Sequence, residues 1–219
     1  MPLSPGVPSH VIPPVWLGEP CESITLSDAT LTLTDFSVAF WPLKETRCES
    51  YTPLDTRPPE ARFQPATPLS FASDIWSLGC TIWALVSHRS LFDASFLATD
   101  DDITAQQVDV LGPLPAEWWG KWEGRLRKFT EAGQPTDGRC VWTWDRRFKE
   151  WVQQPRRDKG MTVFDEKEGE AFSAMIRWML AFRPGHRPSA AQVLETEWMR
   201  DWALPEADQD NGRNIQTKG

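Results

Sequence analysis

Residues 69–88, which read LSFASDIWSLGCTIWALVSH, constrain the fold of this chain more than any other stretch. Across residues 75–86 the large apolar side chains do not keep to one stripe of a helical wheel but surround it. A helix that is apolar on all sides is buried, either in a protein core or in a membrane. The run is shorter than the ~20 apolar residues needed to span a bilayer, and Asp74 stands at its head. We therefore expect a central core helix, N-capped by Ser70 or Ser73, with the other elements packed around it.

The remaining patterns indicate a mainly α-helical domain with a small strand pair near the N-terminus. Residues 24–26 and 31–34 alternate apolar and hydroxyl side chains, with the period of two that short strands show. Helical spacing or helix-start signals recur further along the chain, at residues 103–111, 114–122, 166–180 and 190–195. Residues 132–160 are richer in Gly, Pro and charge, and we expect there a partly ordered insertion whose tryptophans dock on the main body.

The two ends of the chain differ in composition from its middle. Residues 1–20 hold six prolines and two glycines, which predicts an extended connection typical of the middle of a longer protein. Residues 205–219 are mostly polar, and we expect a disordered tail. The segment between them, residues 21–204, is long enough for one domain with a sizeable core.

Charge and cysteine usage exclude several classes of protein. The net charge of −8 argues against direct nucleic-acid binding, which needs a basic surface, and is compatible with basic protein partners. The four cysteines form no CxxC pair and have no histidine at ligand spacing, which argues against a zinc site and a disulfide scaffold. We expect reduced thiols in an intracellular protein of the cytoplasm or nucleus, with no membrane segment. The N-terminus also lacks the basic and apolar regions of a secretory signal.

Three short motifs accompany the core helix. The second predicted strand runs into Asp35-Phe36-Ser37, which taken alone is a loop cap at the end of a strand. Residues 56–61 read TRPPEA and carry Glu60, a side chain that needs a cationic partner if it is buried. Residues 182–190 read FRPGHRPSA and carry Arg187, which taken alone is a surface arginine beside a Pro-Gly turn.

Together these motifs resemble those of eukaryotic protein kinases. Residues 73–80, SDIWSLGC, are similar to the buried helix F of that family, whose usual form is Asp-x-Trp-Ser-x-Gly. Asp35, Glu60 and Arg187 match the Asp-Phe-Gly, Ala-Pro-Glu and closing arginine motifs, in the order that the family shows. The resemblance spans roughly residues 24–204 and implies a kinase-like C-terminal lobe around the buried helix.

The resemblance also implies a role for each matched residue. Asp35 corresponds to the aspartate that binds the magnesium ion bridging the phosphates of ATP, which makes it the candidate cofactor and metal residue. Ser37 replaces the glycine that lets this segment switch conformation. Asp74 corresponds to the aspartate that accepts hydrogen bonds from the catalytic loop; from position alone it is a first-turn carboxylate favoured by the helix dipole. Glu60 and Arg187 are expected to form a structural ion pair.

Further features narrow the resemblance to one group of kinases. Residues 117–119, Glu-Trp-Trp, the segment 132–160 and the closing motif are similar to SR-protein-kinase-like serine/threonine kinases. That group implies ATP-dependent phosphorylation of a protein or peptide substrate, here a basic Ser/Arg-rich one.

Other kinase motifs are absent upstream of Asp35. The 34 residues before it contain no His-Arg-Asp, no GxGxxG and no lysine. Phosphoryl transfer depends on the positioning and electrostatics that those groups supply, so we assign no catalytic residue. We expect a partial serine/threonine kinase domain, a C-terminal lobe that binds neither ATP nor Mg²⁺ tightly and is inactive by itself. The alternatives are a catalytically dead kinase-like binding module and a truncated product with no function of its own.

In a whole kinase domain the N-terminal lobe covers the region around the Asp-Phe-Gly segment. Without that lobe we expect apolar residues around the corresponding segment of this chain to be uncovered. These residues are Leu31, Leu33, Phe36, Val38, Phe40 and Trp41. Large exposed apolar patches recruit partners or cause association, so we expect self-association through this face.

Overall fold

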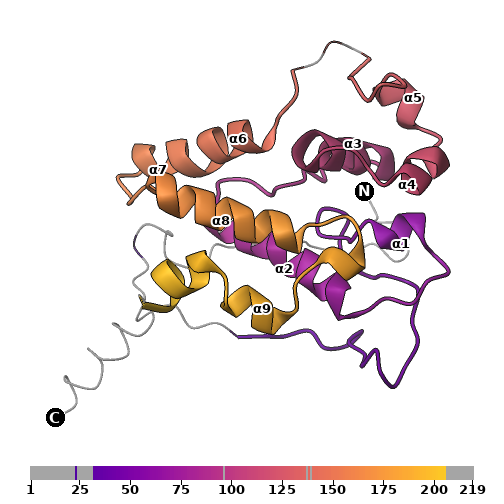
Figure 1. Ribbon diagram of the computed structural model, residues 1–219, viewed down its shortest axis with the longest axis horizontal. Helices are drawn as coiled ribbons and strands as arrows, with labels where there is room; N and C mark the ends of the chain where they lie inside the picture. The colour runs from indigo at the N-terminus through magenta and orange to yellow at the C-terminus, as the bar shows by residue number, and fades with distance from the viewer. Residues whose placement is uncertain (1–22, 24–31, 96, 137, 139, 206–219) are drawn as a thin grey trace, which may run out of the picture.

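The structure is a computed structural model that describes residues 23, 32–95, 97–136, 138 and 140–205 (Figure 1). In this part of the chain helices are joined by irregular segments, and no β-strand is formed beyond one isolated bridge between Phe129 and Pro135. The α-helices are α1 (Glu60–Phe63), α2 (Phe71–Val86), α3 (Asp100–Leu111), α4 (Ala116–Lys121), α5 (Arg125–Lys128), α6 (Trp144–Arg147), α7 (Gln154–Asp158), α8 (Glu166–Met179) and α9 (Ala190–Leu194). The mainly α fold expected from the sequence is confirmed.

Helix α2 runs through the middle of the molecule, as the apolar run predicts. Its N-cap is Ser70, whose side chain accepts a hydrogen bond from the Ala72 N–H, and Ser73 completes a reciprocal capping box. Trp76 and Trp83 on this helix are fully buried. Burial of one large apolar side chain contributes ~1.5–3 kcal/mol, so these two tryptophans fix α2 firmly in the core.

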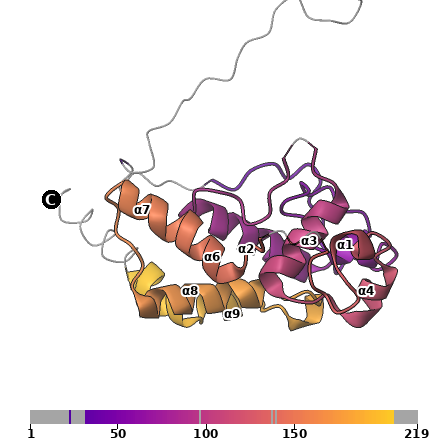
Figure 2. The ribbon, with the colours of Figure 1, turned by 90° about the horizontal axis from the view of Figure 1, so that it is seen from above.

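Helix α8 packs directly against α2. A side chain added at Gly79 of α2 would lie 3.2 Å from Leu180 Cδ2 and Met179 Cβ, so the absence of a Cβ there lets the two segments approach closely. The N-cap of α8 is Asp165, whose side chain accepts from the Glu168 N–H, and its buried face includes Phe172. Figures 1 and 2 show α1, α3 and α4 gathered at one end of the molecule and α7 at the other.

A second apolar cluster joins α1 to the α3–α5 region. Phe63 stacks on Trp118 with ring centroids 5.5 Å apart. Asp101 of α3 accepts hydrogen bonds from Arg62 at 2.5 Å and from the Trp122 indole N–H at 2.8 Å. Asp101 therefore ties both α1 and the segment after α4 to the start of α3.

The segment 132–160 is more regular than its composition predicts. After α6, a π-helical segment over Phe148–Gln153 continues into α7, so residues 144–158 form one helical run. Trp144 is buried, meets Trp83 edge-on at 5.1 Å between ring centroids, and donates to Ser173 Oγ at 3.0 Å. The prediction of a partly ordered insertion is wrong for residues 144–158, whereas the expected docking of its tryptophans is confirmed at Trp144.

Four further expectations need correction or lie wholly or partly outside the described residues. Helix α2 is not covered on all sides, because Phe71, Leu78 and Leu85 on one face are exposed. In the predicted strand pair only residues 32–34 are described, and they form no regular element; the rest of the pair is not described. The expected extended segment 1–20 and the tail after Pro205 also lie outside the described residues.

Candidate functional site

The irregular segment that precedes α1 crosses the start of α2, and the two enclose a cleft of about 330 Å³. Asp35 lies on the segment and Asp74 in the first turn of α2, and both line this cleft. Its other polar lining includes Arg47, Glu49, Tyr51, Ser70 and Ser73. The structure thus brings together two site residues that lie 39 positions apart in the sequence.

Asp35 adopts an unusual backbone conformation. Its φ is 62°, in the left-handed region, which costs a residue with a side chain ~1–2 kcal/mol and is most accessible to Asn and Asp. Its Oδ1 accepts a hydrogen bond from Ser37 Oγ at 3.0 Å. The Ser37 hydroxyl therefore holds the Asp35 side chain within its own loop.

Asp74 presents its carboxylate to the same cleft from the N-terminal turn of α2. Desolvation raises the pKa of this carboxyl, while the helix dipole favours its ionised form. Across the described ranges no side chain or backbone N–H donates a hydrogen bond to it. The position agrees with the dipole interpretation and leaves the carboxylate able to accept hydrogen bonds from a further segment.

Glu60 and Arg187 form the ion pair expected from their motifs. Arg187 Nη2 lies 2.6 Å from Glu60 Oε2, and Nη1 lies 2.8 Å from Oε1. The side chains are 0% and 7% exposed, respectively. This two-pronged geometry joins α1 to the segment before α9, across 127 residues of sequence.

All five N–H donors of Arg187 have acceptors. Besides Glu60, the guanidinium donates to the carbonyl oxygens of Ala72, Ala181 and Phe182 at 2.8–2.9 Å, and it lies 5.0 Å from the centre of the Trp76 ring. Ser73 Oγ donates to Glu60 Oε1 at 3.0 Å, so the start of α2 joins the pair as well. Full pairing is the condition under which a buried charge is tolerated.

Sequence reasoning missed two residues that shape the cleft. Arg47 donates to Glu45 at 2.6 Å and to the Val38 carbonyl at 3.0 Å, and its own carbonyl accepts from the Leu69 N–H at 2.8 Å. It therefore ties the irregular segment to the start of α2. Arg47 lies in no motif that could have marked it in the sequence.

Tyr51 is the second of these residues, and its side chain lines the cleft. Its hydroxyl donates to Glu49 Oε2 at 3.0 Å, and this bond raises the pKa of Tyr51. The ring is exposed, so Tyr51 and Glu49 form a rim of the cleft rather than its floor.

The match to protein-family models covers most of the chain. Residues 22–199 match the protein kinase domain. The chain belongs to the protein kinase domain family. The match extends over the cleft, the Glu60–Arg187 pair and α2 together. Members of this family generally use ATP and Mg²⁺, so the cleft is the place to test for both.

The residues at the cleft fit only part of a nucleotide–magnesium site. Magnesium is usually held by one or two carboxylates and the substrate's phosphates, and Asp35 offers one such carboxylate. Kinases also use a lysine and a glycine-rich loop on the phosphates, and the described lining of the cleft has neither. In the part of the chain that the structure describes, no three Asp, Glu, His or Cys side chains are grouped to hold a metal ion by themselves. We therefore derive no step of phosphoryl transfer from these residues.

None of the described helices combines the length and the apolar character that crossing a bilayer requires.

Proposed function

We propose that this chain is the C-terminal lobe of an SR-protein-kinase-like serine/threonine kinase and that by itself it does not transfer phosphate. The observation that carries the proposal is the cleft, where Asp35 and Asp74 converge without a phosphate-binding lysine. Arg47 is the one cation among its described lining residues, and its guanidinium already donates to Glu45 and to a backbone carbonyl. The cleft thus offers a magnesium ligand but no free cation for the phosphates.

Each matched residue has a role in this proposal. Asp35 is the ligand for the magnesium ion of Mg–ATP, which would neutralise phosphate charge in a complete kinase domain. Asp74 accepts backbone hydrogen bonds from a catalytic loop. This role is supported by its carboxylate, which receives no hydrogen bond from the described residues. Glu60 and Arg187 are structural, because they fix the end of the irregular segment to the core. No residue of this chain is proposed as the catalytic base.

The proposed partner is a basic Ser/Arg-rich peptide. The net charge of −8 favours such a partner, and the cleft places Asp35, Glu49 and Asp74 around one arginine. The free thiols of Cys48, Cys80 and Cys140 agree with a reducing compartment, so we propose the cytoplasm or nucleus.

A catalytically dead binding module is the second candidate. It is favoured by the combination of a lobe fixed through a fully paired buried arginine and a cleft that lacks phosphate-binding groups. Such a module would bind a basic peptide in the absence of nucleotide. The first proposal expects peptide binding to need the rest of a kinase domain.

Titration calorimetry with Mg–ATP and, separately, with a Ser/Arg-rich peptide distinguishes these proposals. We expect no saturable heat from Mg–ATP at micromolar concentrations, and any weak magnesium-dependent signal should disappear in Asp35→Ala. Tight Mg–ATP binding would overturn the proposed inactivity. Saturable peptide binding without nucleotide, weakened in Asp74→Asn, would favour the binding module.

A further inference from the structure

A narrow pocket separates helix α3 from the segment that leads into α1. One of its walls includes Arg57, Pro58 and Pro59, and the other includes Thr104 and Gln107 of α3. Thr104 and Gln107 lie three residues apart and therefore share one face of the helix. The pocket has a volume of about 20 Å³ and shares no lining residue with the cleft.

Gln107 is a buried amide in this pocket that has no protein partner. The residue is 3% exposed, and across the described residues its side-chain amide makes no hydrogen bond. The neighbouring Gln106 shows the usual situation, since it accepts from the Asp93 N–H at 2.8 Å and donates to the Asp93 carbonyl at 3.0 Å. Nearly all buried polar groups in proteins bond to a protein group or to ordered water, because an unpaired one is unfavourable.

Most of the pocket wall has no hydrogen to donate to the Gln107 carbonyl oxygen. Residues 58–59 are both proline and have no backbone N–H. The Thr104 hydroxyl proton is already used, because Oγ1 donates to the Asp100 carbonyl at 2.8 Å. Arg62 Nη1 donates to the Thr104 hydroxyl and to the Asp100 carbonyl, both at 2.5 Å. A direct bond from these groups to Gln107 is therefore excluded.

The Arg57 guanidinium still has N–H groups to donate. Its Nε donates to the Thr52 carbonyl at 3.1 Å, and its Nη1 lies 4.0 Å from Asp100 Oδ1, beyond hydrogen-bond distance. Arg57 and Gln107 belong to opposite walls of the pocket and are not bonded to each other. Two polar groups that face one pocket without touching are commonly joined by a water molecule.

We propose that the pocket binds one ordered water molecule, which joins Gln107 of α3 to the Arg57 guanidinium. A site needs about 10–15 Å³ of such volume and two to four polar partners to hold a water. The volume of about 20 Å³ therefore fits one water and no larger ligand. The water accepts a hydrogen bond from Arg57 and donates one to the Gln107 carbonyl oxygen. This inference goes beyond the proposed function and does not depend on it.

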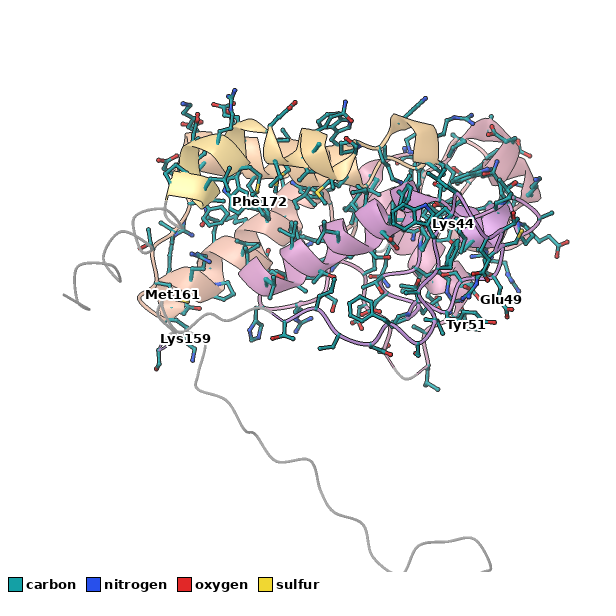
Figure 3. The ribbon with its side chains drawn as sticks, turned by 90° about the horizontal axis from the view of Figure 1, so that it is seen from below. Lys44, Glu49, Tyr51, Lys159, Met161 and Phe172 are labelled. Carbon is teal, nitrogen blue, oxygen red and sulfur yellow. The ribbon has the colours of Figure 1, made fainter. Side chains whose placement is uncertain are left out.

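Through Arg57 the water supports one wall of the cleft. Thr52 lines the cleft, and its carbonyl accepts the bond from Arg57 Nε. In Figure 3 the rim residues Glu49 and Tyr51 lie at the end of the molecule where Figures 1 and 2 show α1 and α3, whereas Met161 lies at the other end. The water is thus a positioning contact between α3 and the segment that forms the cleft.

A high-resolution crystal structure of the chain tests the site directly. We expect one water peak within about 3.2 Å of both the Gln107 amide and an Arg57 nitrogen. Gln107→Met keeps the length of the side chain without its amide and should lose this peak. Gln106→Met removes the neighbouring amide, which bonds directly to Asp93, and should keep the peak as the matched control. A Gln107 amide bonded directly to a protein group, or no peak in the unchanged chain, would overturn the proposal.

Solution NMR tests the link to the cleft. Gln107→Met should shift the backbone amide signals of Arg57 and of residues 52–53, because the contact that holds the guanidinium is lost. Gln106→Met should leave those signals in place and shift the amide signal of Asp93 instead. Unchanged signals at Arg57 in Gln107→Met, or equal shifts there in the two variants, would show that the water does not support the cleft wall.

Discussion

Removal of the Arg187 side chain should produce the largest single loss of stability that this structure predicts. Arg187→Ala leaves the buried Glu60 carboxylate without its cation and three backbone carbonyls without their donor. Breaking a buried ion pair in this way costs ~3–5 kcal/mol. With a urea dependence of ~2 kcal/mol per molar for a small domain, the midpoint of unfolding should fall by about 2 M.

The matched control is the exposed ion pair between Arg183 and Glu117. Their side chains are 46% and 45% exposed and lie 2.7 Å apart. A surface pair of this kind contributes ~0–1 kcal/mol, so Arg183→Ala should move the midpoint by less than about 0.5 M. The double variant Glu60→Gln, Arg187→Met should lose less stability than the two single changes added together. The reasoning is refuted if Arg187→Ala and Arg183→Ala shift the urea midpoint equally.

Gly79 and Asp102 give two further predictions, one for the free energy of unfolding and one for a pKa. Gly79→Ala should destabilise the protein by ~1–3 kcal/mol in urea unfolding, because the new Cβ lies 3.2 Å from Met179 and Leu180 at the end of α8. The control Gly120→Ala, whose new Cβ has nothing within 4 Å, should be neutral or stabilising. Equal losses of stability in the two variants would contradict the close approach of α2 and α8. The hydrogen bond from Lys128 lowers the pKa of Asp102 from 3.8 to about 2. The ionised Asp102 therefore stabilises the folded protein above pH 3.8, and this stabilisation is lost as the pH falls through about 2. After discounting for solvent screening this amounts to less than about 1 kcal/mol; NMR titration should show the Asp102 pKa rising in Lys128→Ala, and no change would rule the contact out.

The core helix and the buried ion pair were predictable because each rests on a local signal. Ser70 caps a long apolar run, and the Glu60 and Arg187 motifs each have a defined partner in the resemblance. The bond from Ser73 to Glu60 was not predictable, because a hydroxyl at a helix start has many possible acceptors and only the tertiary fold selects one. Arg47 lies in a segment without periodicity, so the sequence gives no indication of what it contacts.

The two corrected expectations fail for different physical reasons. In the segment 132–160, Gly, Pro and charge obscured the helical spacing of Trp144, Phe148 and Val152, a signal that was present in the sequence and could have been read. The open face of α2 could not have been found in that way. A helical wheel locates apolar side chains, but it does not tell whether a neighbouring element covers them.

The most direct test of the account is a phosphate-transfer assay on the purified chain. The protein is incubated with Mg–ATP and a Ser/Arg-rich peptide, with Asp35→Ala in parallel, and peptide phosphorylation is measured by mass spectrometry. We expect no transfer above the level without protein, because the described lining of the cleft contains no lysine and the proposed function assigns no catalytic base. Robust magnesium-dependent phosphorylation that disappears in Asp35→Ala would contradict it.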